Sequence, residues 1–173
     1  MCDNIILEID TKNLISDTKM FFGPEREKNA KRVQLSNILY LPSMQNKILQ
    51  VKADTTTTGT NVYQTFVVFN DVIILLDRAE EDMVRFKGPS GFFYYFKPVD
   101  IDSDVRVSCS CLDFYYRFAV FDDKNKALFG KAPPPYIKKT NRPYVNPFKT
   151  PGVCKHTIAL INRLKNRKFF SKY

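Results

Sequence analysis

The chain has 173 residues, of which 44% are hydrophobic and 14% aromatic, and a disordered chain lacks this supply of apolar side chains. The amino terminus, MCDNIILEID, carries acidic residues where a signal peptide needs basic ones, and no later stretch approaches the ~18 apolar residues of a membrane span. We therefore expect one folded domain, with or without a small appendage, that is neither secreted nor inserted in a membrane.

The net charge of +9 is unevenly distributed along the chain. Residues 124–173 contain 13 Lys or Arg and no acidic residue, whereas residues 1–123 contain 14 basic and 18 acidic residues and carry −4. Such a basic segment contacts nucleic acid or an acidic protein surface, or is merely solvated. Charge alone leaves these three alternatives open.

Short β-strands are expected to dominate the first hundred residues. The clearest hairpin joins NKILQVKA to VYQTFVVF through the turn DTTTTGTN, because the first strand alternates and the second is β-branched and aromatic. Residues 21–31, FFGPEREKNAK, are predicted to be a connecting loop, and residues 78–87 a charged turn or one helical turn. Further strands are predicted over residues 5–9, 33–42, 71–76 and 92–99.

Helices are expected only late in the chain. Asp113 is a candidate cap for a short helix through FYYRFAVF, and TIALINRLKNRKFF has the three-residue apolar spacing of a terminal helix. Between them, residues 124–153 hold six of the ten prolines, which disfavour regular structure and predict a long extended loop. The predicted fold is mainly β (α+β): an antiparallel β body over residues 1–104, then a module over residues 105–173 with this Pro/Lys-rich loop and the helix.

Three cysteines and the sole histidine predict one zinc site. Cys109 and Cys111 lie two apart at the end of VRVSCSC, so both thiolates face the same side of an extended strand. Cys154 and His156 must straddle a helix start, because residues two apart inside a helix point to nearly opposite sides. Four protein ligands around Zn²⁺ leave no position for water, so we expect a structural ion that clamps the loop at both ends.

The alternatives to a metal site fit the spacing less well. The cysteines would be small buried apolar residues and the histidine an ordinary hydrogen-bonded side chain, or Cys109 and Cys111 would form a strained disulfide. Cys2 is expected to be a free thiol. With the only histidine assigned to metal, and with no Walker loop, G-x-S-x-G or dinucleotide motif, we do not expect an enzyme.

CSC followed by CKH resembles the C-x-C…C-x-H signature of SWIM-type zinc fingers. Over roughly the last 70 residues, the run SCSCLDFYYRFAVFDDKNKALFG…PPPY…RP…NP…TPGVCKHTIAL resembles small structural proteins of tailed bacteriophages, especially contractile-tailed phages of marine and cyanobacterial hosts. The resemblance implies a non-enzymatic virion subunit of the tail baseplate or neck, assembled in the host cytoplasm within a symmetric assembly of other virion subunits. The insert of 42 residues between the ligand pairs is longer than is usual in SWIM modules.

A basic surface is the second candidate site. It is predicted to contact neighbouring subunits or, in the alternative of a SWIM-like nucleic-acid-binding protein, phosphates. Four of its residues belong to the loop and two to the terminal helix: Lys138, Lys139, Arg142, Lys149, Arg163 and Arg167.

Overall fold

The structure is a computed structural model that describes residues 10–57, 59, 61–77, 79–134, 137, 139 and 141–171. The predicted strand at residues 5–9, the thiol of Cys2 and the side chain of Lys138 lie outside the described residues.

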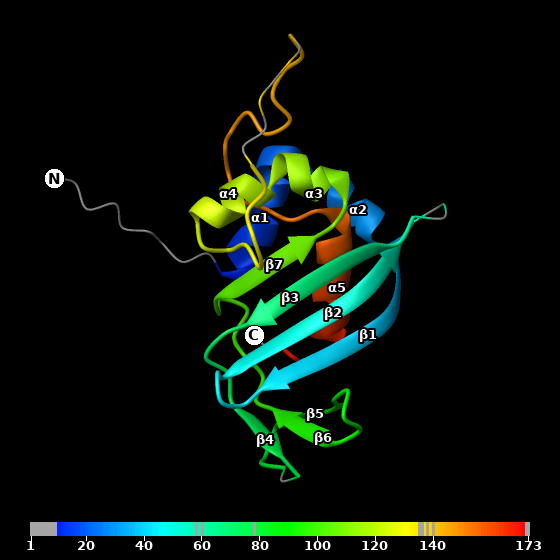
Figure 1. Cartoon of the computed structure of the whole chain (residues 1–173), viewed down its shortest axis with the longest axis vertical. Helices are drawn as coiled ribbons and strands as arrows, with labels where there is room; N and C mark the ends of the chain where they lie inside the picture. Colours follow the sequence, from blue (N-terminus) through cyan, green and yellow to red (C-terminus); the bar gives the residue numbers. More distant parts are fainter. Residues whose placement is uncertain are drawn as a thin grey trace, which may run out of the picture.

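A four-stranded antiparallel sheet forms the centre of the molecule (Figure 1). Its order is β1-β2-β3-β7, with the bounds Gln34–Ser43, Ile48–Thr56, Tyr63–Phe69 and Val105–Cys109. The predicted hairpin is confirmed as β2 and β3, in which Val51 pairs with Val67. β1 runs one residue past Pro42, which an edge strand tolerates because one of its sides is unpaired.

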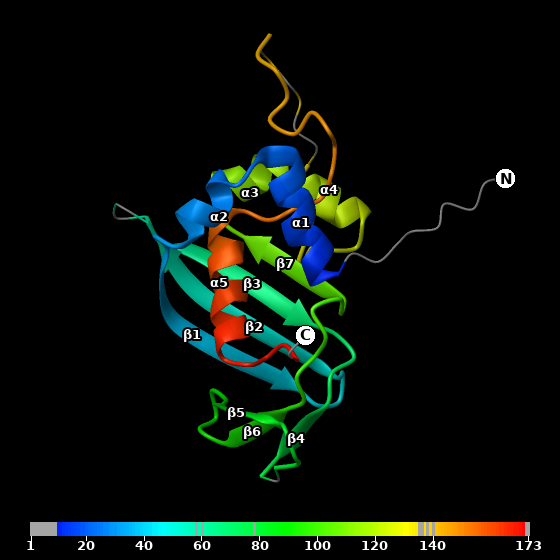
Figure 2. The ribbon, with the colours of Figure 1, turned by 180° about the vertical axis from the view of Figure 1, so that it is seen from behind.

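The sheet buries one face against helix α5, Lys155–Asn166, which crosses the strands (Figure 2). Strict alternation in β2 places every second side chain on this face. Tyr40, Val51, Val67 and Val107 are opposite one another across the four strands, and all are buried. α5 covers them with Ile158, Ile161 and Leu164, the residues that predicted the helix.

A smaller three-stranded sheet, of order β4-β6-β5, lies at one end of the long axis (Figure 1). Its strands are Ile74–Leu76, Phe93–Phe96 and Val84–Lys87. Aromatic rings join this sheet to the main one: the ring centroid of Phe169 is 5.3 Å from that of Tyr40 and 5.2 Å from that of Phe96. The chain after α5 therefore returns to the core.

Helices α1, α2, α3 and α4 surround the other end of the main sheet, with the bounds Thr11–Phe22, Glu25–Ala30, Leu112–Arg117 and Ala119–Lys124. The predictions that helices appear only late and that residues 21–31 form a loop are wrong. Asp10 caps α1 by accepting the Asn13 N–H, Leu14 and Thr18 are buried one turn apart, and Gly23 ends the helix with φ 75°. None of the helices in the described part of the chain is long and apolar enough to cross a membrane.

The predicted Pro/Lys-rich loop begins one residue too early, because Lys124 is the last residue of α4; the described residues after it form neither helix nor strand before α5, apart from an isolated bridge at Leu128. Val107 donates its N–H to Ala127 and accepts one from Phe129, so the start of the loop lies along the open edge of β7. The part from residue 130 to residue 144, called the arm below, extends beyond α3 and α4 (Figure 1). The fold is thus mainly antiparallel β with a few helices, including one near the carboxyl end, as the sequence predicted.

Candidate metal centre

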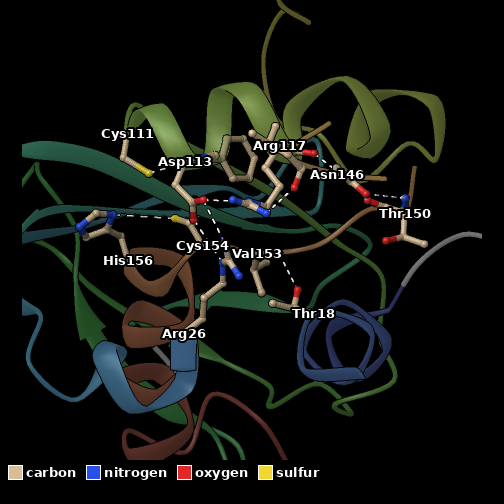
Figure 3. A network of polar contacts seen from close by, with 12 residues as sticks. Thr18, Arg26, Cys111, Asp113, Arg117, Asn146, Thr150, Val153, Cys154 and His156 are labelled. Atoms are coloured by element: carbon tan, nitrogen blue, oxygen red, sulfur yellow. Dashed lines mark hydrogen bonds and ion pairs between the residues drawn. The ribbon is translucent and has the colours of Figure 1, made fainter. Parts of the chain in front are cut away.

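The structure brings the predicted ligand residues together. One donor atom from each of Cys109, Cys111, Cys154 and His156 lies within 4.8 Å of the other three, and all four residues are buried. They come from β7, from the start of α3 and from the start of α5 (Figure 3 shows three of them). Segments that are 42 residues apart therefore meet at one point.

Extended backbone positions the first pair. Cys109 is the last residue of β7, and Cys111 is the N-cap of α3 with φ −76° and ψ 149°. Between them, Ser110 exchanges two 3.0 Å hydrogen bonds with the backbone of Gln64, which prolongs the pairing with β3 by one residue. Both sulfurs consequently face the same side, as the C-x-C spacing predicted.

A helix start positions the second pair. Cys154 is the N-cap of α5 with φ −79° and ψ 168°, and His156 lies in the first turn. Two hydrogen bonds hold the backbone just before Cys154. Gly152 N–H donates to the Asp122 carboxylate at 2.9 Å, and Val153 N–H donates to the Thr18 hydroxyl at 2.8 Å. A Cβ atom at position 152 would lie 2.6 Å from Thr18 Oγ1, so only glycine fits there.

Each of the three sulfurs has a hydrogen-bonding neighbour at 3.4 Å. Cys111 accepts the N–H of Phe114, Cys109 accepts the hydroxyl of Thr65, and Cys154 is in contact with the hydroxyl of Thr157. Such contacts stabilise thiolates and orient metal ligands. Thr65 and Thr157 were not among the predicted site residues, although Thr157 is three residues after the N-cap of α5 and Thr65 is on a predicted strand.

His156 directs Nδ1 towards the sulfurs. The Nδ1 atom is 3.8 Å from Cys109 Sγ and 3.9 Å from Cys154 Sγ, and the ring packs at 4.9 Å from that of Tyr63. The other nitrogen, Nε2, is buried and has no hydrogen-bond partner within the described part of the chain. Aromatic packing, and not the usual second hydrogen bond, therefore holds this imidazole.

The donor atoms lie close enough together to hold one metal ion. Bonds of about 2.3 Å to sulfur and about 2.0–2.1 Å to nitrogen give tetrahedral edges of roughly 3.5–3.8 Å, close to the sulfur–nitrogen distances found here. Without metal the thiols share protons. Hydrogen bonds with the sulfurs of Cys109 and Cys154 and with the Phe114 N–H lower the pKa of Cys111 to about 4. Hydrogen bonds with the sulfurs of Cys111 and Cys154, together with burial, raise the pKa of Cys109. A metal ion would replace the shared protons.

A charged network lies directly beside the cluster (Figure 3). Asp113 accepts two hydrogen bonds from Arg26 of α2, at 3.2 and 3.0 Å, and one from Arg117 at 3.0 Å. Burial alone would raise the pKa of Asp113, but the two guanidinium groups outweigh it and lower that pKa. The prediction that Asp113 caps α3 is wrong, because Cys111 takes that position and Asp113 instead ties α3 to α2.

The same network holds the returning part of the loop. Arg117 donates to the carbonyl of Val145 and accepts with its own carbonyl from the side chain of Asn146, at 2.9 Å. The amide of Asn146 also donates to the Thr150 carbonyl at 2.7 Å. Residues 145–153 are therefore fixed to the helices, and the arm starts and ends beside the cluster.

The predicted basic surface is divided between two places. Lys139, Arg142 and Lys149 are exposed on the loop, whereas Arg163 and Arg167 are exposed near the far end of α5. His156 and Arg167 are 11 residues apart, roughly 16 Å along a helix. These groups do not form one continuous site in the described residues.

Comparisons with protein-family models, with curated proteins and with solved structures find no match for this chain.

Proposed function

We propose that the protein is a zinc-binding, non-enzymatic structural subunit of a tailed-phage virion, in the tail baseplate or the neck. In this proposal one zinc ion holds β7, α3 and α5 together and so fixes the base of the arm, which docks on neighbouring subunits. The observation that carries it is the buried cluster of three sulfurs and one imidazole nitrogen within 4.8 Å of one another.

Zinc is the ion that suits these donors. Structural zinc takes three thiolates and one imidazole in a closed tetrahedral shell, and soft sulfur ligands select against Mg²⁺ and Ca²⁺. Zinc binding supplies about 10–16 kcal/mol in small zinc-finger peptides. With its four positions taken by the protein, the ion has none left for substrate, which supports a structural role over a catalytic one.

The virion role is supported by the resemblance of residues 108–160 to phage structural proteins and by the form of the loop. Proline-rich segments lose little conformational entropy when they dock, and the loop exposes large apolar side chains at Ile137, Phe148 and Val145. The hydrogen bonds at Arg117 and Asn146 present the arm from a fixed base. These features favour a docking segment over a solvated linker.

Elemental analysis tests the metal. The purified chain is expected to contain one zinc per molecule, and the double variant Cys154→Ala/His156→Ala none, because it lacks half of the ligand set. Cys2→Ser is the matched control, since Cys2 is not one of the four proposed ligands, and this variant should retain zinc. A metal-free wild-type chain that is fully folded would contradict the proposal. Cross-linking mass spectrometry on purified particles would then identify the neighbours.

Nucleic-acid binding is the second candidate, and it is favoured by the absence of any acidic residue from residues 124–173. It predicts that the chain is retained on DNA of unrelated sequences and that Lys138→Ala/Lys139→Ala/Arg142→Ala abolishes the retention. Each lost phosphate contact should also reduce the salt slope of binding by about one. Tight binding to other particle proteins, without DNA retention, would exclude it.

A further inference from the structure

The small sheet and the arm lie at opposite ends of the long axis (Figure 1). Residues 77–82, between β4 and β5, hold four acidic residues and one arginine and carry −3. At the end with the small sheet, the turn between β4 and β5 exposes four carboxylates, called the acidic turn below: Asp77, Glu80, Glu81 and Asp82. At the other end, the arm exposes Lys131, Lys139 and Arg142. None of the ion pairs found among the described residues involves any of these seven side chains.

We propose that the arm of one copy of this chain docks on the acidic turn of a second copy, so that copies associate head to tail. The proposal deepens the proposed function, on which it rests, by naming the partner of the arm. Because the two contacting surfaces are different, the contact is heterologous, and repetition gives a ring or a filament.

The receiving surface is hollowed as well as charged. A cavity of about 710 Å³ lies beside the acidic turn. Glu81, Asp82 and Val84 line one part of it and Phe170 another, and Lys97 and Lys168 also border it. It therefore offers carboxylates for the arm's basic residues and an apolar wall for an aliphatic or aromatic side chain.

The arm carries matching chemistry. Ile137 is 78% exposed and Tyr144 is 58% exposed, so two large apolar groups stand among the basic side chains. Phosphate recognition uses the charges but not an exposed isoleucine, whereas a protein groove buries such a side chain, which is favourable because apolar area leaves water. Nucleic acid would also leave the acidic turn without a role. A second copy of the chain would use both the arm and the acidic turn, which favours it as the partner.

Sedimentation velocity measures the association. At a concentration on the order of 100 μM, the zinc-loaded wild-type chain is expected to form oligomers at about 0.1 M salt and to dissociate at about 1 M, where the Debye length falls from ~10 to ~3 Å. A chain that remains monomeric at the lower salt concentration overturns the proposal.

Charge reversal identifies the surfaces. Glu80→Lys/Glu81→Lys and Lys139→Glu/Arg142→Glu should each weaken association at least tenfold, because like charges then meet. Mixing the two variants should restore it, since each arm again finds a turn of opposite charge. Asp102→Lys/Asp123→Lys is the matched control, which makes the same change in net charge at exposed carboxylates elsewhere and should leave association intact.

Two other outcomes overturn the inference: oligomers that survive reversal of the acidic turn, or mixed variants that stay monomeric. DNA binding that depends on the arm, without self-association, would assign the arm to nucleic acid instead. Zinc content is measured in every sample. Normal zinc with no association refutes only the head-to-tail contact, whereas absent zinc refutes the proposed function itself.

Discussion

His156 and Phe169 are both buried beside α5, one in its first turn and one just beyond its last, but their surroundings differ. His156 lies beside three sulfurs, two of which contact threonine hydroxyls at 3.4 Å. Phe169 lies among aromatic rings of β1, β5 and β6, with centroid distances of 5.2–6.2 Å. One helix thus links a polar cluster to an aromatic one.

The two clusters stabilise the fold by different means. Burial of the aromatic rings is favourable in itself, because apolar area leaves water. Burial of thiols and an imidazole is costly unless they are hydrogen-bonded or bind a metal, and Nε2 of His156 lacks a partner in the described residues. The end of α5 beside Phe169, called the aromatic end below, should therefore fold without metal. The end beside His156, called the cysteine end, should depend on metal.

Removal of metal tests this difference most strongly. Prolonged dialysis against a chelator is expected to lower the melting temperature by more than 10 °C, since a structural zinc contributes up to about 10–16 kcal/mol. Hydrogen exchange should accelerate on the first turn of α5 and on α3, while β5 and β6 keep their protection. Re-addition of zinc should reverse both changes. Equal loss of protection at the two ends would break the comparison.

Phe169→Ala tests the opposite end. Removing a fully buried ring should cost about 3–5 kcal/mol of unfolding free energy, because the remaining rings cannot fill the cavity. Zinc content should stay at one per chain. Phe92→Ala, which truncates a ring that is 57% exposed, is the control and should cost little. Loss of zinc from a folded Phe169→Ala protein would show that the two clusters are not independent.

The cysteine cluster could be predicted from sequence because its information is local. Residue spacing alone determines whether two side chains can face the same side of a strand or lie on either side of a helix start. C-x-C has the first spacing and C-x-H the second. Thr65 could not be assigned in this way. Its place beside Cys109 depends on the register of β3 and β7, which pair across 44 residues.

The missed helix α1 has a different cause. Its signals were present, with Asp10 as cap and Gly23-Pro24 as stop, but its apolar face is interrupted by Thr18. Thr18 is buried all the same, because its hydroxyl donates to the Leu14 carbonyl at 2.7 Å and accepts from Val153 at 2.8 Å. A polar residue on the buried face hid the helical periodicity. The aromatic cluster likewise needed tertiary structure, since Tyr40, Phe96 and Phe169 are far apart in sequence.

Asp113→Asn sharpens the comparison within the cysteine end, by separating the charged network from the metal. The substitution removes the carboxylate that Arg26 and Arg117 share. Because these two ion pairs are only partly exposed, we expect the free energy of unfolding to fall by about 1–2 kcal/mol. Zinc content should not change. Asp123→Asn, an exposed carboxylate on α4, should be neutral in chemical denaturation. An equal effect of both variants would mean that the network adds no stability.

Asp122→Asn has the smallest expected effect, and the effect is on how the stability of the protein depends on pH. The carboxyl group is buried, accepts only the Gly152 N–H within the described residues, and leaves Oδ2 without a partner, so burial raises its pKa well above the ordinary value. The folded state therefore holds this proton more tightly than the unfolded state. Stability from this group is greatest below the unfolded pKa of about 3.9 and declines as pH rises towards the folded pKa.

Asparagine cannot ionise and still accepts the Gly152 N–H, so the variant should avoid that decline. Its free energy of unfolding relative to wild type should therefore increase as pH rises above the unfolded pKa of about 3.9. Asp123→Asn is the matched control, because it makes the same substitution at an exposed carboxylate of the same helix. A difference that stays constant with pH would mean that Asp122 is ionised in the folded protein. The cysteine end would then bury a charge beside its thiolates, and it would depend even more strongly on the positive ion that we place there.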